Sequence, residues 1–453
     1  MTAKPLDLQM PSLMGRVMRS SAWSALGYLG SQGLRLASNL ILTRLLFPEA
    51  FGMMTLVSVF LVGLTMFSDM GTGPAIMHHK RGEEADFLNT AFTLQMIRGV
   101  ILFGLTCVLA YPVSLFYGLP ELALILPASG VTLLMNGLMP TRIETETRHL
   151  RVGQLTVLDM IAQIIGLIVT IGLSWALQSV WALVLGGIFA TLAKLILTWT
   201  TLPGLVNRFR WEPQAAHDLM RFGFWLFLST ACGFIASQGD KAVLGKYLTL
   251  DQLGIYNIGY FLASFPILLG YAITGRLLIP IYRESSPAGS TENFARLRKM
   301  RFILSGTLIT LLAVLAVLGQ WIVGILYDDR YVQSGAVLVM VAIIQMPLVV
   351  GRSYDHAALA AGDSRNFFYY ALTRAVFLIL GLILGAETAG MFGALAGSGL
   401  ATVLSYPVLV WLARRHHAWD PEHDLIIWGI SALIVAFVIW QDADVLTSLM
   451  SAF

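Results

Sequence analysis

Five basic residues stand inside hydrophobic stretches of this sequence that are long enough to cross a bilayer. They are Arg35, Arg98, Lys194, Lys241 and Arg374. A charged side chain in hydrocarbon is costly, so such residues usually face a wet cavity or a partner of opposite charge. Guanidinium groups offer paired donors to a phosphate, and an ammonium group offers a compact charge. The pattern predicts a membrane protein with a cationic interior that carries an anionic compound.

Two of these cations also have a structural explanation that needs no substrate. Arg98 could neutralise Asp159, and Lys194 could extend its ammonium group to the membrane interface. Asp69 and Asp159 are also candidates to titrate if transport is coupled to protons or sodium ions. Transport driven by the membrane potential alone remains an open alternative.

The other cations are candidates to bind the substrate. Asp240 and Lys241 are adjacent, and they could instead form a polar pair near the end of a helix. Arg374 could be a structural cation between helices. Arg35 lies near the middle of its stretch and is the hardest to explain without a cavity. We expect Arg35, Arg98, Asp240, Lys241 and Arg374 to contact the substrate.

The stretches that carry these residues dominate the composition. The chain has 453 residues, of which 57% are hydrophobic and 12% are charged, and its mean hydropathy is +0.74. Soluble domains are closer to a quarter charged, and a spanning helix needs about 20 mostly apolar residues. The sequence therefore predicts an all-α integral membrane protein. Its expected spans are 22–46, 51–69, 88–116, 121–140, 152–177, 179–202, 219–247, 253–280, 300–326, 332–354, 366–386, 390–412 and 424–440.

Basic residues are distributed unevenly between alternate loops, which predicts the orientation. With a cytoplasmic N-terminus, 21 of the 29 Lys and Arg residues fall on the cytoplasmic side. The opposite side holds three, Arg44, Lys246 and Arg330, and the remaining five are the membrane cations named above. Cytoplasmic loops are enriched in Lys and Arg. We therefore expect a multi-pass membrane protein with its N-terminus in the cytoplasm.

Several other classes of site are disfavoured. Residues 1–20 lack the continuous apolar core of a cleavable signal. Cys107 and Cys232 fall within spans and are typical of apolar packing residues rather than of a disulfide or a metal site. No GxxxxGK[ST] phosphate-binding motif occurs, and the net charge of +3 needs no nucleic-acid partner. We expect no metal and no cofactor.

The chain contains an internal repeat. Residues 41–52 match residues 243–254 without gaps, at an offset of 202, and Thr72-Gly73 matches Thr274-Gly275 at the same offset. An even number of spans in each half would give both halves the same orientation, as in parallel-repeat transporters. The expected organisation is an N-terminal cytoplasmic or interfacial segment 1–20, an N-lobe 21–202, a cytoplasmic linker 203–217, a C-lobe 218–414 and an extra C-terminal membrane segment 415–453.

These repeated hairpins resemble a known family. The segment LILTRLLFPEAFGMMTLV, followed by SDMGTGPAIM, resembles the opening of bacterial polysaccharide and oligosaccharide flippases. The later segment GDKAVLGKYLTLDQLGIYNIGYFLA is similar to the seventh and eighth helices of that family. The flippases belong to the multidrug/oligosaccharidyl-lipid/polysaccharide exporter superfamily. Members commonly have 12 or 14 helices, and the thirteen spans expected here depart from both.

The resemblance implies two six-helix lobes in parallel repeat around a central cavity. It also implies a location in the bacterial inner membrane and export of a lipid-linked oligosaccharide, typically on undecaprenyl diphosphate, from the inner to the outer leaflet. A polysaccharide polymerase and chain-length machinery are further candidate partners. Two alternatives stay open. One is a multidrug antiporter of the same superfamily, for which acidic and aromatic cavity residues are expected. The other is a membrane glycan polymerase or ligase, which would normally need a large external loop.

Overall fold

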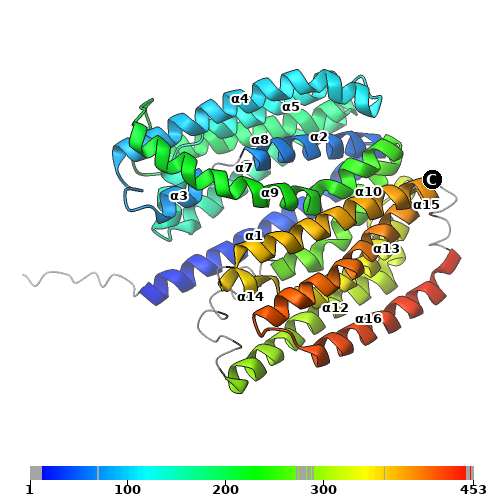
Figure 1. The fold of residues 1–453 in the computed structure, drawn as a ribbon. Coiled ribbons are helices and arrows are strands. Elements are labelled where there is room, and N and C mark those ends of the chain that lie inside the picture. Colours follow the sequence, from blue (N-terminus) through cyan, green and yellow to red (C-terminus); the bar gives the residue numbers. More distant parts are fainter. Residues whose placement is uncertain are drawn as a thin grey trace, which may run out of the picture. The chain divides into compact units, whose positions relative to one another are not determined.

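The computed structural model describes residues 13–68, 71–271, 290–352, 354–361 and 363–444, together with positions 274, 282, 287 and 449. Every regular element in these residues is a helix (Figure 1). The chain divides into two compact units. Unit 1 comprises Met1–Leu45 and Phe67–Phe227, and unit 2 comprises Leu46–Met66 and Leu228–Phe453.

Unit 1 is built from long apolar helices joined by short turns. Helix α4 packs along α5, α5 along α8, and α7 along both α8 and α1 (Figure 1). Gly118, at φ +69, ends α4 in the left-handed conformation that glycine favours. The helices are α1 (Leu13–Leu45), α3 (Thr72–His78), α4 (Ala85–Tyr117), α5 (Leu122–Gly137), α6 (Arg142–Arg148), α7 (Val152–Leu177) and α8 (Val180–Thr201). Helix α9 (Pro213–Tyr247) begins in unit 1 and continues into unit 2.

Unit 2 is organised around α13, which packs against α10, α12, α15 and α16. Its central position explains why α13 is apolar on all sides and why most of its residues are buried. Helix α10 starts at a capping box formed by Thr249 and Gln252. The helices are α2 (Pro48–Phe67), the later part of α9, α10 (Leu250–Ala263), α12 (Thr291–Leu326), α13 (Ser334–Gly351), α14 (Asp355–Ala360), α15 (Ser364–Arg415) and α16 (Pro421–Gln441), with the short 3₁₀ turn η1 (Asp329–Tyr331).

Helix α15 is a hairpin of two spans. Its backbone leaves the helical region at Ala389 and Gly390, where φ is −148° and +57°. A Cβ on Gly385 would lie 2.0 Å from the carbonyl oxygen of Gly393, so the two arms are in backbone contact. The break confirms the two spans predicted at 366–386 and 390–412.

The helices make this a multi-pass membrane protein. In the described residues, eight helices are long and apolar enough to cross a membrane, or ten if each of two bent helix pairs is one span. Each of the thirteen expected spans lies at least partly on a helix, which confirms the all-α fold class. The division groups α2 with unit 2. The arrangement as two six-helix lobes stays a prediction.

Candidate functional site

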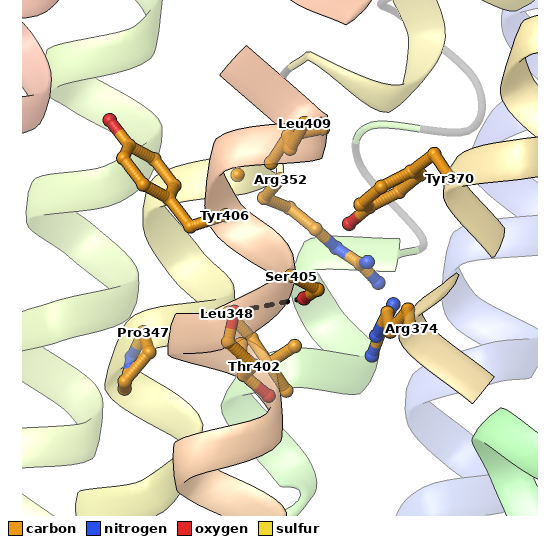
Figure 2. Close-up of a pocket in the computed structure, with 10 residues that line it drawn as sticks. Pro347, Leu348, Arg352, Tyr370, Arg374, Thr402, Ser405, Tyr406 and Leu409 are labelled. Atoms are coloured by element: carbon orange, nitrogen blue, oxygen red, sulfur yellow. Dashed lines mark hydrogen bonds between the residues drawn. The ribbon is translucent and has the colours of Figure 1, made fainter. Parts of the chain in front are cut away.

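A polar pocket opens between α13 and α15 of unit 2. Arg352, Arg374, Tyr370 and Ser405 line it, and Figure 2 shows both guanidinium groups directed to the same side, near the hydroxyl groups of Tyr370 and Ser405. The remaining lining residues are Pro347, Leu348, Gly351, Thr402, Tyr406 and Leu409. Two cations with hydroxyl groups and apolar walls make a site for an anion that carries an apolar group.

Arg352 is a pocket residue that the sequence analysis missed. It follows the last residue of α13, its exposure is 4%, and its Cζ atom lies 3.0 Å from the centre of the Tyr271 ring. The distribution of basic residues places Arg352 among the 21 on the cytoplasmic side. The signal was nevertheless in the sequence, because Arg352 falls inside the expected span 332–354.

Arg374 connects this pocket to a second cluster, which is centred on Tyr260. The Lys241 ammonium lies 5.0 Å from the centre of the Tyr260 ring, a distance typical of a cation–π contact. Asp240 and Arg374 both lie close enough for their charges to act on the Tyr260 hydroxyl. The structure thus brings together three of the five predicted substrate-binding residues.

Asp240 has a defined partner in the cluster. The hydroxyl of Tyr256 donates a short hydrogen bond to its carboxylate, and the Tyr256 side chain is fully buried. Lys241, Arg352 and Arg374 outnumber this one carboxylate, so the pocket and the cluster together carry a net positive charge. Such a balance favours an anionic ligand over a cationic one.

The other predicted residues lie in unit 1. Arg35 is exposed on α1, and its Nη1 atom lies 3.4 Å from Oε1 of Gln32. Arg98 is half-buried on α4 and donates from Nε to the Ser68 hydroxyl at 2.9 Å. Both positions are compatible with the predicted contacts but do not establish them.

The candidate coupling residues have different outcomes. Asp159 pairs with Lys194 at 2.8 Å, so this salt bridge joins α7 to α8 in place of the Arg98–Asp159 alternative. Asp69 lies outside the described residues. No group of three or more His, Cys, Asp or Glu side chains that could hold a metal ion occurs in the part of the chain that the structure describes.

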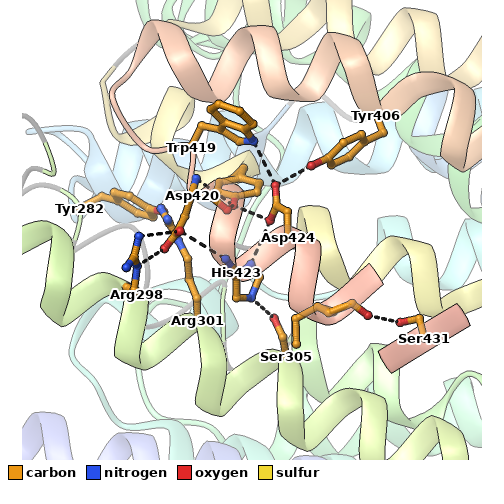
Figure 3. Close-up of polar contacts among 12 residues, drawn as sticks. Tyr282, Arg298, Arg301, Ser305, Tyr406, Trp419, Asp420, His423, Asp424 and Ser431 are labelled. Atoms are coloured by element: carbon orange, nitrogen blue, oxygen red, sulfur yellow. Dashed lines mark hydrogen bonds and ion pairs between the residues drawn. The ribbon is translucent and has the colours of Figure 1, made fainter. Parts of the chain in front are cut away.

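A buried polar network attaches α16 to the pocket. The carboxylate of Asp424, at 3% exposure, accepts hydrogen bonds from Tyr354 at 2.7 Å, Tyr406 at 2.6 Å and Trp419 at 3.1 Å (Figure 3). His423 Nδ1 lies 2.9 Å from the same carboxylate. Because Tyr406 also lines the pocket, Asp424 fixes one wall of the candidate site.

The same network is tied to α12. Arg298 binds Asp420 through two hydrogen bonds of 2.6 and 2.9 Å (Figure 3). It also donates a hydrogen bond of 2.6 Å to the exposed Glu422. Arg301, at 1% exposure, stacks on Tyr354 with its Cζ atom 4.7 Å from the ring centre. The sequence analysis had assigned Arg301 to a cytoplasmic loop, yet its side chain is buried inside unit 2.

Comparison with known proteins identifies the family. Residues 41–336 match the family model described as "Polysaccharide biosynthesis protein", which covers more than half of the chain. The chain belongs to this family. This confirms the predicted membership among the polysaccharide and oligosaccharide exporters.

Two bacterial biosynthesis proteins align over most of the chain. The succinoglycan biosynthesis transport protein ExoT of Rhizobium meliloti is 23% identical over 93% of this chain and 86% of its own length. The teichuronic acid biosynthesis protein TuaB of Bacillus subtilis is 22% identical, covering 89% of this chain and 83% of its own length.

Solved structures show the same fold. The lipid II flippase MurJ in an inward closed conformation superimposes with a TM-score of 0.69 at 14% identity, covering 92% of each chain. An inward-facing multidrug resistance MATE transporter of the MOP superfamily gives 0.62 at 16% identity, covering 85% of this chain and 95% of that chain. Both likenesses establish the fold alone.

Proposed function

We propose that this protein is a flippase that moves a lipid-linked oligosaccharide, attached through a diphosphate, to the outer leaflet of the cytoplasmic membrane. The observation that carries the proposal is the pair of guanidinium groups, Arg352 and Arg374, in one pocket with hydroxyl groups. A diphosphate suits this pair because each guanidinium offers two parallel donors to phosphate oxygens. The ligand's glycan would then be used for surface polysaccharide assembly.

The membrane potential would favour this direction of transport. An anion that leaves a negative cytoplasm gains about 2.3 kcal/mol per charge per 100 mV. The family membership and a relative named as a succinoglycan transport protein support a polysaccharide-related substrate. The net positive charge of the pocket and cluster argues against a multidrug cation as the cargo. Arg35 and Arg98 are proposed as further contacts of the same substrate in unit 1.

The test is reconstitution of the purified protein in vesicles with undecaprenyl-diphosphate oligosaccharide on the inner leaflet. We expect the glycan to become accessible to an external glycosidase with the wild type, and to stay protected with Arg374→Ala. In cells, a deletion strain should accumulate the lipid-linked glycan on the cytoplasmic leaflet. Efflux of ethidium without any glycan translocation would refute the proposal and favour the multidrug alternative.

A further inference from the structure

Four buried side-chain oxygen atoms in the described part of unit 1 lack a hydrogen-bond partner, and two of these are the hydroxyl groups of Ser129 and Ser174. The other two are Oε1 of Gln95 and Oε2 of Glu144. Both side chains adjoin the start of α3: Gln95 Nε2 lies 3.2 Å from Thr72 Oγ1, and a Cβ on Gly73 would lie 3.7 Å from Glu144 Cγ. A buried acceptor without a donor costs free energy, so each of these atoms needs a physical explanation.

The fold holds these side chains in a fixed place. Gln95 lies on α4, Glu144 on α6 and Thr72 at the first position of α3, and α3 packs against both of the other helices. Helix α6 is clamped to α3 because Arg148 donates to the carbonyl oxygens of Ile76 at 2.7 Å and of His79 at 2.8 Å. The two acceptors therefore belong to a rigid corner of unit 1.

The charged groups of the surrounding helices make contacts with other atoms. Lys194 on α8 is close enough for its charge to act on Glu144, but its ammonium pairs with Asp159 of α7 at 2.8 Å. The arginines donate hydrogen bonds to other groups: Arg98 to the Ser68 hydroxyl, Arg142 to the carbonyl oxygens of Trp199, Leu202 and Leu205, and Arg148 to those of Ile76 and His79. His79, which follows α3, stacks on Phe87.

We propose that Glu144, Gln95 and Thr72 form a binding site for a small monovalent cation, either a sodium ion or a proton. A carboxylate, an amide carbonyl and a hydroxyl supply the oxygen ligands that hard cations take. A proton on the carboxylate would likewise remove its charge from this buried corner. A sodium ion would give both acceptors a ligand bond, whereas a proton would neutralise the Glu144 carboxylate.

This inference goes beyond the proposed function, because it adds a cation site in unit 1 to the anion pocket in unit 2. It depends on that function only for its purpose, which would be to couple cation movement to glycan transport. Binding itself can be measured without any glycan. Failure of the cation site would therefore leave the anion pocket standing, and the reverse also holds.

The experiment uses the purified full-length protein in detergent, with sodium chloride replaced by choline chloride at constant ionic strength. If the site takes sodium, the melting temperature of the wild type rises saturably with sodium, and Glu144→Gln abolishes the rise. If it takes a proton, sodium has no effect. The wild-type melting temperature then rises relative to Glu144→Gln as the pH falls from about 8 to about 6, because the buried carboxyl binds a proton more tightly than the unfolded chain does.

Two further variants make the result specific. Glu146→Gln lies on the same short helix, where Glu146 instead pairs with Arg151 at 3.4 Å, and it should keep the wild-type response. Gln95→Leu removes one orphan acceptor without changing charge, and it should reduce the response if Glu144→Gln cannot be purified. Identical sodium and pH responses in the wild type and in these Glu144 or Gln95 variants would overturn the proposal, as would loss of the response in Glu146→Gln.

Discussion

Gly52 and Gly254 make reciprocal backbone contacts in unit 2. A Cβ on Gly52 would lie 1.9 Å from the carbonyl oxygen of Leu250, and a Cβ on Gly254 would lie 1.9 Å from the carbonyl oxygen of Pro48. Pro48 and Leu250 are the first residues of α2 and α10. Each contact therefore maps onto the other at the 202-residue offset of the sequence repeat. This local symmetry supports the interpretation of the two hairpins as copies of one unit.

We expect Gly52→Ala or Gly254→Ala to destabilise unit 2. A methyl group cannot occupy a position 1.9 Å from a carbonyl oxygen, so the helix ends must separate. Overpacking of this kind costs about 1–3 kcal/mol. The loss of stability is measured by thermal unfolding of the protein in detergent. The matched control is Gly306→Ala in α12, where no atom lies within 4 Å of the added Cβ. A loss of equal size in the control would contradict this explanation.

Much of the fold was predictable because hydrocarbon imposes long apolar helices. The spans, their connection by short polar turns and the break within α15 all follow from hydropathy and from glycine positions. The short helices α3, α6 and α14 were not predicted, because segments of six or seven residues are too short to give the signal of a membrane span. The grouping of α2 with unit 2 depends on tertiary contacts, and apolar sequence does not specify these.

The candidate site was predictable only in part. The search for cations inside expected spans found Lys241 and Arg374. In the structure both lie close to Tyr260. The same search passed over Arg352, which stands near the end of the expected span 332–354, and it did not address the acidic Glu144, which follows the expected span 121–140. Near the end of a span, a sequence pattern does not distinguish a solvated side chain from a buried one. Their burial comes from neighbouring helices distant in sequence.

Removing either pocket guanidinium should impair transport with little change in the amount of folded protein. A hydrogen bond to a charged group contributes about 1.5–3 kcal/mol. We therefore expect Arg352→Gln and Arg374→Gln each to lower glycan translocation at least about tenfold. Arg365→Gln is the control, because Arg365 bonds to Tyr369 on the exposed surface of α15. Unchanged translocation by both pocket variants would remove the pocket from the transport pathway.

The orientation can be tested by cysteine labelling. Lys80 and Asp329 are exposed residues in segments that the charge distribution places on opposite sides of the membrane. In a background that lacks Cys107 and Cys232, an impermeant thiol reagent should label Asp329→Cys in intact cells. It should label Lys80→Cys only after the membrane is permeabilised. The opposite pattern would invert the proposed topology.

Stability should depend on Asp363 at acidic pH. Hydrogen bonds from the side chain and backbone of Asn366 lower the pKa of this carboxyl, which caps α15. A lowered folded-state pKa contributes stability above the unfolded pKa of about 3.9, and this is lost as the pH falls through the folded value. Asp363→Ala should cost about 0.5–2 kcal/mol at neutral pH, as for other N-caps. Unfolding curves should converge with the wild type in acid, and a difference that stays constant there would exclude this mechanism.

Asp424 should stabilise α16 far more than its neighbour Glu422 does. Its carboxylate accepts hydrogen bonds from Tyr354, Tyr406 and Trp419 in a buried setting. Asp424→Ala leaves these donors without their acceptor, at about 1–3 kcal/mol for each unsatisfied group. Glu422, by contrast, is 70% exposed beside Arg298, and such surface pairs contribute about 0–1 kcal/mol.

The measurement is the melting temperature of both variants, followed by the same assay on Tyr406→Phe. This variant keeps the aromatic ring and removes one donor to Asp424, so its loss should be smaller than that of Asp424→Ala. Because Tyr406 lines the pocket, Tyr406→Phe should also weaken glycan translocation where Glu422→Ala does not. Equal melting temperatures for Asp424→Ala and Glu422→Ala would show that the network does not hold α16 in place.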